Sequence, residues 1–200
     1  FGSDTIDALN AQKRLSKTEA KKRLRLEDFY IITCGYNASP SQNHCKILDA
    51  IEKIRLQLPQ NTCLVFPFTY GGTEQYTNEV NQRLERSGIK YVMYTDYLSL
   101  DEIVALTQSS DIFIHMQNSD AYSASVQEYL LCDVAVINAV WLKYPTLEAF
   151  GKPYKQIDTF EQLSDSILEI LLGQYPIIPT ELKSVISKNG WNEKAKDWMT

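Results

Sequence analysis

The stretch "IITCGYNASPSQNHCKILDAIEKI", residues 31–54, runs from apolar residues through a glycine and a polar cluster into a second apolar pattern. The second pattern repeats at intervals of three and four residues, at Ile47, Leu48, Ile51, Ile54 and, just beyond the stretch, Leu58. This spacing predicts a helix with one apolar stripe, and the run before the glycine predicts a buried strand that the stripe can cover. A strand, a glycine turn and a helix start are typical of parallel sheets, where they form sites for phosphate-bearing ligands.

The same alternation of short apolar runs and longer amphipathic runs continues through the rest of the chain. Strands are predicted at residues 30–34, 62–66, 91–94, 112–115, 134–138 and 154–157. Helices are predicted at residues 17–26, 42–58, 74–87, 99–109, 123–131, 146–150, 160–172 and 179–189, followed by a tail with two tryptophans. This order predicts an α/β fold with a doubly wound, mainly parallel, Rossmann-like sheet of about six strands.

Composition limits the class of protein and its partners. The 200 residues, 44% of them hydrophobic, suit one sizeable domain with a terminal extension. The formal net charge of −5 argues against a general nucleic-acid binder, because nucleic acids bind basic surfaces. The four cysteines have no CxxC spacing, which favours small apolar side chains in a reducing compartment over a zinc site or a redox pair. They are Cys34, Cys45, Cys63 and Cys132.

Positive charge gathers ahead of the first predicted strand. The basic residues are Lys13, Arg14, Lys17, Lys21, Lys22, Arg23 and Arg25, interrupted by Glu19. A solvated helix face explains such a run, and contact with an anionic membrane surface or with another domain is the alternative. The sequence starts without methionine, and Gly2 and Ser3 resemble a cloning scar, so we expect an excised domain whose site is shared with a further domain. No secretory signal and no apolar run of about 18 residues occurs, so no membrane span is expected.

The loops after the predicted strands contain the candidate binding residues, because ligands bind at the carboxyl ends of parallel strands. In the first loop, Gly35 allows a sharp turn, and hydrogen-bonding groups with a candidate donor or base follow it. These groups are Asn37, Ser39, Ser41 and His44. In the second loop, Tyr70 and Gly71 lie where the chain can approach a ligand closely. The alternatives are a helix cap and a structural histidine in the first loop and an ordinary turn in the second.

The loop after the fourth predicted strand has the most informative pattern. Its small residues Ser123, Ala124 and Ser125 leave backbone amides at a helix start accessible to a diphosphate, whose negative charge the helix dipole favours. Glu128 can accept hydrogen bonds from the vicinal hydroxyls of a ribose, and a salt-bridged or solvated helix residue is the alternative. Motifs for nicotinamide cofactors, phosphate loops, zinc proteases and metal-chelating carboxylates do not occur in the sequence, so neither a cofactor nor a metal is expected.

Three segments resemble the C-terminal, donor-binding half of glycosyltransferases with the two-domain GT-B architecture. The segments are "RLEDFYIITCGYNASPSQNHCKILDAI" (residues 25–51), "YTDYLSLDEIVALTQSSDIFIHMQ" (94–117) and "DAYSASVQEYLLCDVAVIN" (120–138). The third is similar to the E-x7-E stretch of those enzymes, with Asp120 in place of the first glutamate and Glu128 as the second.

Within that superfamily, a more specific resemblance rests on two loops. The segments "GYNASPSQNH" (35–44) and "PFTYGGTEQYTNEV" (67–80) resemble the bacterial TDP-N-acetylfucosamine:lipid II N-acetylfucosaminyltransferases, and the chain also has some features of group 4 glycosyltransferases. The first loop departs from many retaining members of the superfamily, because it lacks their arginine and lysine and has only His44 and Lys46 as nearby basic groups.

The resemblance implies a cytoplasmic glycosyltransferase domain that binds a nucleoside-diphosphate sugar for synthesis of a bacterial surface polysaccharide or a lipid-linked glycan. Asp120 would face the transferred sugar, with His44 as a second catalytic candidate. Tyr70, Tyr94 or Tyr97 would stack on the base. The reaction would need no metal, and the acceptor would bind on a missing N-terminal domain, with peripheral contact at the inner face of the cell membrane if the acceptor is lipid-linked.

The resemblance also implies a division of the chain into three parts. Residues 1–26 would be a charged helix and linker from the missing N-terminal domain, residues 27–175 the nucleotide-sugar-binding domain, and residues 176–200 a helical extension. Two alternatives to a glycosyltransferase stay open. One is a nucleotide-sugar epimerase-like domain, which would need a second domain and a histidine-rich site, and the other is a non-catalytic doubly wound interaction module.

Overall fold

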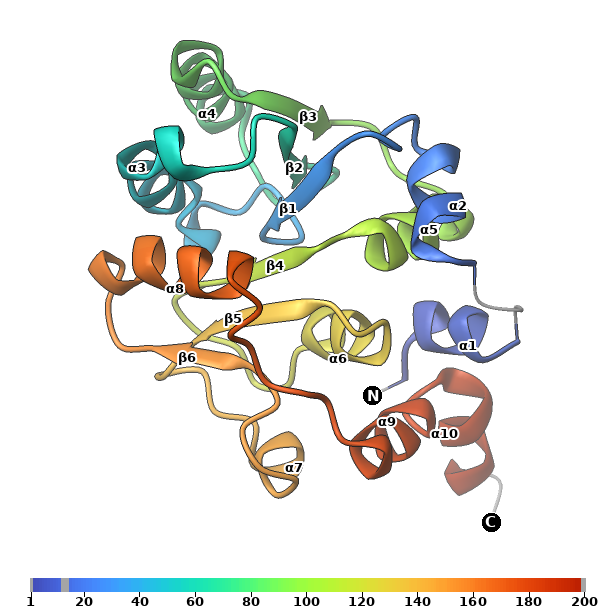
Figure 1. Cartoon of the computed structure of the whole chain (residues 1–200). Coiled ribbons are helices and arrows are strands. Elements are labelled where there is room, and N and C mark those ends of the chain that lie inside the picture. Colours follow the sequence, from blue (N-terminus) through green and yellow to red (C-terminus); the bar gives the residue numbers. More distant parts are fainter. Residues whose placement is uncertain (1, 12–14, 199–200) are drawn as a thin grey trace.

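Six parallel strands form one sheet in the order β3-β2-β1-β4-β5-β6 in a computed structural model that describes residues 2–11 and 15–198 (Figure 1). The strands are β1 Tyr30–Cys34, β2 Thr62–Pro67, β3 Lys90–Tyr94, β4 Ile112–His115, β5 Ala135–Ala139 and β6 Lys155–Ile157. Each lies within about one residue of its predicted bounds. The strand order reverses between β1 and β4, as in doubly wound sheets that bind ligands at this point. The predicted fold class is confirmed.

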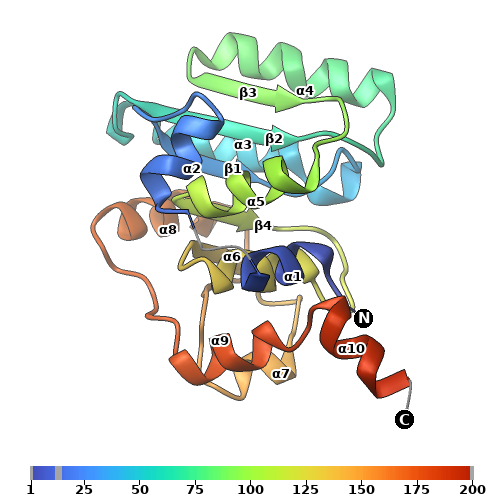
Figure 2. The ribbon, with the colours of Figure 1, turned by 90° about the vertical axis from the view of Figure 1, so that its right-hand side faces the viewer.

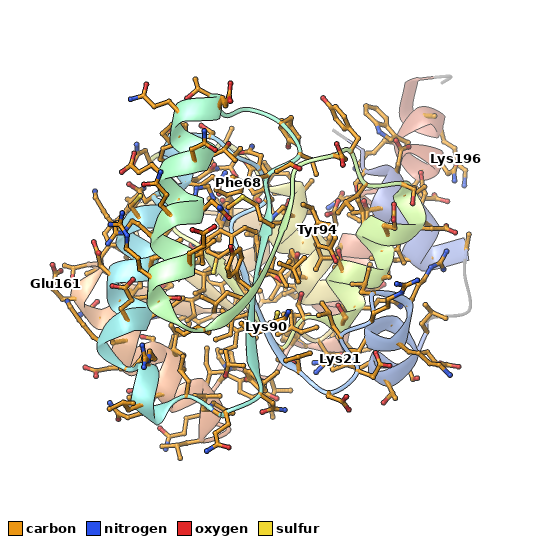
Figure 3. All side chains as sticks on the ribbon, turned by 90° about the horizontal axis from the view of Figure 1, so that it is seen from above. Lys21, Phe68, Lys90, Tyr94, Glu161 and Lys196 are labelled. Atoms are coloured by element: carbon orange, nitrogen blue, oxygen red, sulfur yellow. The ribbon has the colours of Figure 1, made fainter. Side chains whose placement is uncertain are left out.

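Helices cover both faces of this sheet. One face carries α3 His44–Lys53, α4 Glu74–Ser87 and α8 Glu161–Leu171, and the other carries α2 Lys17–Arg23, α5 Leu100–Ser109 and α6 Ala124–Leu131 (Figure 1). Figure 3 labels Glu161 and Lys21 on these opposite sides, and it labels Lys90 and Tyr94 at the start and the end of β3. The short α7 Pro145–Glu148 follows β5. In the part of the chain that the structure describes, no helix is long and apolar enough to cross a membrane.

Successive residues of β1 pack on opposite faces of the sheet, as the strand period requires. Ile31 belongs to an apolar cluster with Val65 and Leu106 of α5. Ile32 belongs to a second cluster that contains the apolar stripe of α3 and of the residues just after it. All five predicted members of that stripe are buried, at Ile47, Leu48, Ile51, Ile54 and Leu58. Burial of each such side chain stabilises the fold by about 2 kcal/mol.

The helix predicted at residues 42–58 is divided into three pieces. The 3₁₀ helix η1 Pro40–Gln42 precedes α3, and a second 3₁₀ helix, η2 Arg55–Gln57, follows it. Asn43 stands between η1 and α3 with a left-handed backbone, at a φ of 61°. Asparagine tolerates this conformation because its short polar side chain bonds locally, so the first loop turns once more before α3 begins.

A helix at the start of the chain, α1 Asp4–Ala11, was not predicted. It buries Ile6 and Leu9 and contacts α5, α9 Thr180–Ser187 and α10 Trp191–Trp198. The Ser3 amide donates a hydrogen bond of 3.0 Å to the Asn189 carbonyl. Figure 2 shows α1 beside α6, with α9 and α10 below it, so the first and last helices lie together on one side of the molecule.

The basic run ahead of β1 is partly used inside the fold. Lys21 Nζ donates a hydrogen bond of 2.7 Å to the Asp111 carboxylate, and Lys17 Nζ lies 3.1 Å from the same group. The Lys21 side chain is only 13% exposed, and this ion pair joins α2 to the short segment between α5 and β4. Lys13 and Arg14 of the run lie outside the described residues.

The prediction that the cysteines are small buried residues is confirmed for two of them. Cys34 and Cys63 are buried, whereas Cys45 and Cys132 are partly exposed, and none of the four forms a disulfide within the described residues. Burial raises the pKa of the Cys63 thiol to about 11, which keeps it protonated at neutral pH.

Replacement of Gly35 by alanine is expected to destabilise the fold. Gly35 has a φ of +68°, and an added Cβ would lie 2.9 Å from both Gln42 Oε1 and His44 Nε2. Gly173 has a φ of +79°, and an added Cβ there would have no atom within 4 Å. Gly173→Ala therefore measures only the cost of a left-handed backbone at an alanine. We expect the free energy of unfolding to fall by about 2–4 kcal/mol for Gly35→Ala and by about 1 kcal/mol for Gly173→Ala. Urea unfolding measures both losses, and equal losses would contradict the crowding at Gly35.

Candidate functional site

A cavity of about 490 Å³ opens at the carboxyl edge of the sheet, within the size range of ligand pockets. Its walls come from the ends of β1, β2 and β3, from α5, from the loop after β4 and from the start of α6. The cavity therefore lies around the reversal in strand order, which is where doubly wound sheets bind their ligands.

The structure brings several of the predicted site residues together in this cavity. They are Tyr70, Tyr97, Asp120, Ser123, Ala124, Ser125 and Glu128. The other predicted residues are placed outside its lining. They are Gly35, Asn37, Ser39, Ser41, Gly71 and His44. The lining of the cavity also includes residues that sequence reasoning missed, among them Tyr36 from the loop after β1 and Thr5 from α1.

The start of α6 forms one wall of the cavity. Ser123 precedes the helix, and its hydroxyl accepts a hydrogen bond from the Val126 amide at 3.2 Å. Helix geometry leaves the amides of Ala124 and Ser125 without a carbonyl partner in the helix, and both residues line the cavity. The positive end of the α6 dipole therefore lies at the cavity, which favours an anionic group there.

Glu128 lines the same wall, further along α6. Its Oε1 accepts a hydrogen bond of 2.6 Å from the Ser3 hydroxyl, and the residue is only 8% exposed. Burial raises the pKa of Glu128, and hydrogen bonds from the hydroxyls of Ser3 and Thr5 oppose that rise. Glu128 is therefore not a solvated helix residue. Ser3, which resembles a cloning scar in the sequence, is a buried part of this site.

Asp120 lines the cavity from the loop after β4 and is held by three donors. Its Oδ1 accepts a hydrogen bond from the Tyr122 amide at 3.2 Å. Its Oδ2 accepts one from the Tyr144 hydroxyl at 3.2 Å and lies 3.4 Å from His115 Nε2. Burial alone would raise the pKa of Asp120, but the hydrogen bonds from His115, Tyr144 and Tyr122 outweigh it and lower the pKa below its ordinary value.

Sequence reasoning missed His115 and Tyr144 as members of the site. His115 is the last residue of a predicted strand, so its position at the carboxyl edge was a usable signal. Tyr144 follows β5 in a segment without a periodic pattern, and its contact with Asp120 is set by the tertiary structure alone.

The polar residues of the first loop hydrogen-bond to one another, and those predicted to bind phosphate lie outside the lining of the cavity. Asn37 Oδ1 accepts a hydrogen bond from the Ser39 amide at 2.9 Å, and the hydroxyl oxygens of Ser39 and Ser41 lie 2.8 Å apart. The Ser39 hydroxyl also caps η1. Gly71 packs on this loop, where an added Cβ would lie 3.6 Å from the Asn37 side chain. These contacts are those of a local cap, and Gly35, with its positive φ, forms the turn.

His44, predicted as a catalytic candidate, is a core residue and lies outside the lining of the cavity. Its side chain is fully buried, and its ring centroid lies 4.5 Å from that of Phe68 and 5.8 Å from that of Phe66. Its Nδ1 lies 3.1 Å from the Tyr76 hydroxyl. Burial lowers the pKa of His44 to about 3, so the imidazole is neutral at ordinary pH.

No protein-family model and no curated protein matches the sequence. Solved structures are nevertheless similar to it in fold. The C-terminal domain of the glycosyl transferase group 1 family protein LpcC from Francisella tularensis matches over 98% of both chains, with 15% identity and a TM-score of 0.67. Anabaena HepE (Alr3699), solved with UDP and glucose, matches over 92% of this chain and 52% of its own, with 15% identity and a TM-score of 0.67. Sucrose-phosphate synthase (tll1590) from Thermosynechococcus elongatus matches over 90% of this chain and 47% of its own, with 12% identity and a TM-score of 0.68.

These likenesses concern the fold. The chain has the Rossmann-like fold of the C-terminal domains of GT-B glycosyltransferases. It spans nearly all of the LpcC domain and about half the length of HepE and of sucrose-phosphate synthase.

The raised pKa of Glu128 predicts a pH dependence of stability. A carboxyl with a higher pKa in the folded chain than in the unfolded chain stabilises the fold fully only below the unfolded value, here 4.5, and the contribution is lost as pH rises through the folded value. Glu128→Gln stays neutral, so we expect this variant to gain stability relative to the unchanged chain as the pH is raised from about 4 to about 7. Urea unfolding across that range measures the difference.

Glu102→Gln is a control of opposite sign. A hydrogen bond from Ser99 lowers the pKa of Glu102, so the Glu102 carboxylate stabilises the fold above its ordinary pKa and loses this effect as pH falls through the lowered value. The advantage of the unchanged chain over Glu102→Gln should therefore grow toward neutral pH. A stability difference for Glu128→Gln that did not vary with pH would contradict the burial of an ionisable carboxyl at this position.

Proposed function

We propose that this chain is the donor-binding domain of a glycosyltransferase, the domain that holds a nucleoside-diphosphate sugar. The observation that carries the proposal is the cavity at the carboxyl edge, where the start of α6 meets two carboxyl side chains and two exposed tyrosines. The carboxyls belong to Asp120 and Glu128, and the tyrosines are Tyr70 and Tyr97. The fold supports the proposal, because HepE, whose structure contains UDP and glucose, has a similar one.

Each part of such a ligand has a suitable group in the cavity. The diphosphate would lie at the amides of Ala124 and Ser125, where the α6 dipole favours negative charge. Glu128 would accept hydrogen bonds from the ribose hydroxyls. Tyr70 and Tyr97 are 49% and 82% exposed, so both present ring surface on which a base can stack.

The proposed chemistry follows from where charge develops in the reaction. Transfer of the sugar breaks the bond between its anomeric carbon and the diphosphate oxygen, and the electron pair stays on the diphosphate. None of the described residues that line the cavity is a lysine or an arginine. Backbone amides at the start of α6 and the hydroxyls of Ser123 and Ser125 would therefore stabilise the leaving group, and the proposal uses no metal ion. Neutral donors attract a diphosphate less than cations do, so we expect weak donor binding.

The biological setting is a finer part of the proposal. The resemblance of residues 35–44 and 67–80 to N-acetylfucosaminyltransferases makes a TDP-sugar the first donor to test, and a bacterial surface polysaccharide or a lipid-linked glycan the first class of product. Residues 27–175 would be the donor domain. The acceptor and any general base would lie on a further domain across the cavity, so this chain alone would transfer nothing. The enzyme would work in the cytoplasm, at the inner membrane face if its acceptor is a lipid.

The rival functions have less support from the geometry. An epimerase-like domain would need histidines beside the nucleotide, and His44 and His115 are both fully buried. A non-catalytic interaction module would have no use for a cavity that combines a helix start with buried carboxyl groups. Ligand binding separates the rivals from the proposed function.

Titration with UDP, TDP and GDP tests the proposal directly. We expect one of the three, at millimolar concentration, to shift the backbone amide NMR signals of Ser123, Ala124, Ser125 and Glu128 together. Signals from α8, on the opposite face of the sheet, should stay in place and serve as the internal control (Figure 3). If none of the three nucleotides shifted the α6 signals, the proposed function would be contradicted for this chain.

Removal of the Tyr97 ring should weaken nucleotide binding. Tyr97 lines the cavity and is 82% exposed, so Tyr97→Ala removes a stacking surface without opening the core. We expect the Kd of the bound nucleotide to rise about fivefold to thirtyfold, as for the loss of one base-stacking contact. Tyr175→Ala is the matched control, because Tyr175 is 47% exposed and lies outside the cavity lining. Calorimetry gives both constants, and equal values would argue against stacking on Tyr97.

A further inference from the structure

Asp120 belongs to a hydrogen-bonded group that extends from the cavity into the core. Tyr144 donates its hydroxyl proton to Asp120 Oδ2 at 3.2 Å, and His115 Nε2 lies 2.9 Å from the Tyr144 oxygen and 3.4 Å from the same Oδ2. His115 and Tyr144 are fully buried, whereas Asp120 lines the cavity. Of these three side chains, only that of Asp120 can therefore touch a ligand.

The hydrogen bonds fix the position of the proton on His115. The Tyr144 hydroxyl has one proton, which goes to Asp120, so its oxygen accepts a hydrogen bond from His115 Nε2–H. Burial lowers the pKa of His115, so the ring carries a single proton and its Nδ1 carries a lone pair. Nδ1 has no hydrogen-bond partner among the described residues, which suits a lone pair better than a buried N–H. His115 therefore donates mainly to the Tyr144 oxygen at 2.9 Å and more weakly toward Asp120 Oδ2 at 3.4 Å, whereas Tyr144 donates to Oδ2 directly.

Aromatic packing keeps these two donors in place. The His115 ring stacks on Tyr36 with 5.9 Å between ring centroids. The Tyr144 ring meets the rings of Tyr122 and Tyr154 edge-on, each at a centroid distance of 6.4 Å. Rings packed in this way have little freedom to rotate, so the carboxylate that they bond is held in one orientation before any ligand arrives.

The number of lone pairs leaves one clear acceptor for a ligand. A carboxylate offers about four lone-pair positions, two on each oxygen. Oδ2 of Asp120 faces both Tyr144 and His115, whereas Oδ1 accepts a hydrogen bond from the Tyr122 amide and from no other described residue. We propose that His115 and Tyr144 are positioning residues, which hold Asp120 so that its Oδ1 accepts one hydrogen bond from a hydroxyl of the donor's sugar.

This inference rests on the proposed function and adds a specificity to it. An ionised carboxylate only accepts hydrogen bonds, so the sugar must present an O–H or an N–H at this point. A sugar deoxygenated there would leave a desolvated acceptor without a partner and would bind less well. His115 and Tyr144 act through Asp120 and do not touch the sugar themselves.

The first test measures the Asp120 carboxyl without any nucleotide. Its carboxyl carbon is followed by NMR through an acid titration in the unchanged chain, in Tyr144→Phe and in His115→Phe. Both variants keep an aromatic ring and lose one donor, so we expect the pKa of Asp120 to rise in each. His115→Gln restores an N–H near the position of Nε2 and should bring the pKa back toward that of the unchanged chain. Tyr154→Phe is the control, because the Tyr154 hydroxyl donates to Glu148 and not to Asp120.

The second test measures recognition of the sugar. The Kd of a nucleoside diphosphate is compared with that of its glucose ester, as UDP with UDP-glucose, TDP with TDP-glucose or GDP with GDP-glucose, for the base that binds. The preference for the sugar ester is the Kd of the diphosphate divided by the Kd of its glucose ester. We expect Tyr144→Phe and His115→Phe to reduce this ratio about threefold to tenfold while the Kd of the diphosphate alone stays unchanged. Tyr154→Phe should leave both values unchanged.

The two tests separate failure of the inference from failure of the proposed function. An Asp120 pKa that is the same in the unchanged chain, Tyr144→Phe and His115→Phe would overturn the positioning role, whatever the nucleotides do. A sugar preference that is absent in the unchanged chain or survives in both variants would overturn the role in sugar recognition. Failure of all three nucleotides to bind would overturn that role together with the proposed function, and the acid titration alone would then decide the positioning role.

Discussion

The cavity depends on a buried polar contact between the loops that follow β1 and β4. Gln117 Oε1 accepts hydrogen bonds from the Tyr36 hydroxyl at 3.0 Å and from Gln42 Nε2 at 2.8 Å, and Gln117 is only 4% exposed. β1 and β4 are neighbours in the sheet, but the segments that follow them lead to opposite sides of it. The pairing of the strands therefore does not by itself hold the two loops together. Buried amide groups that lost these partners would destabilise the fold by about 1–3 kcal/mol each. The contact therefore fixes the distance between Tyr36 and Asp120, which lie on two walls of the cavity.

Sequence reasoning was accurate where the determining interactions are local. The apolar runs placed all six strands, and the small residues before Glu128 placed the start of α6. It failed where the partner lies far along the chain. α1 was missed because Ile6 and Leu9 alone make too short a pattern, and the helix is buried only through contacts with α5, α9 and α10. The Ser3 partner of Glu128 is 125 residues away in sequence, so a local pattern could not identify it.

The first loop shows why a polar loop after a strand is an ambiguous signal. Asn37, Ser39 and Ser41 have the right chemistry for a phosphate site, yet they bond to each other and to the backbone. The Asn118 amide also donates to the Ser41 carbonyl at 2.9 Å, which joins this loop to the one after β4. In sequence, groups that face a ligand and groups that face one another have the same composition. The loop after β4 differs because its small residues open a helix start, whose amides have no other partner in the helix.

The pKa values of the two carboxyl groups of the cavity are shifted in opposite directions, and this bears on what the cavity can bind. Hydrogen bonds lower the pKa of Asp120 despite its burial, whereas burial raises the pKa of Glu128 despite its bonds to Ser3 and Thr5. Glu128 shares the α6 wall with the proposed diphosphate position, so an ionised Glu128 would repel the negative charge of the diphosphate. The raised pKa of Glu128 makes its protonation easier, and a protonated carboxyl group would not repel the diphosphate but would still hydrogen-bond to hydroxyl groups. Asp120 lines the cavity from the loop after β4. Its negative charge would there meet a neutral sugar hydroxyl, which it does not repel.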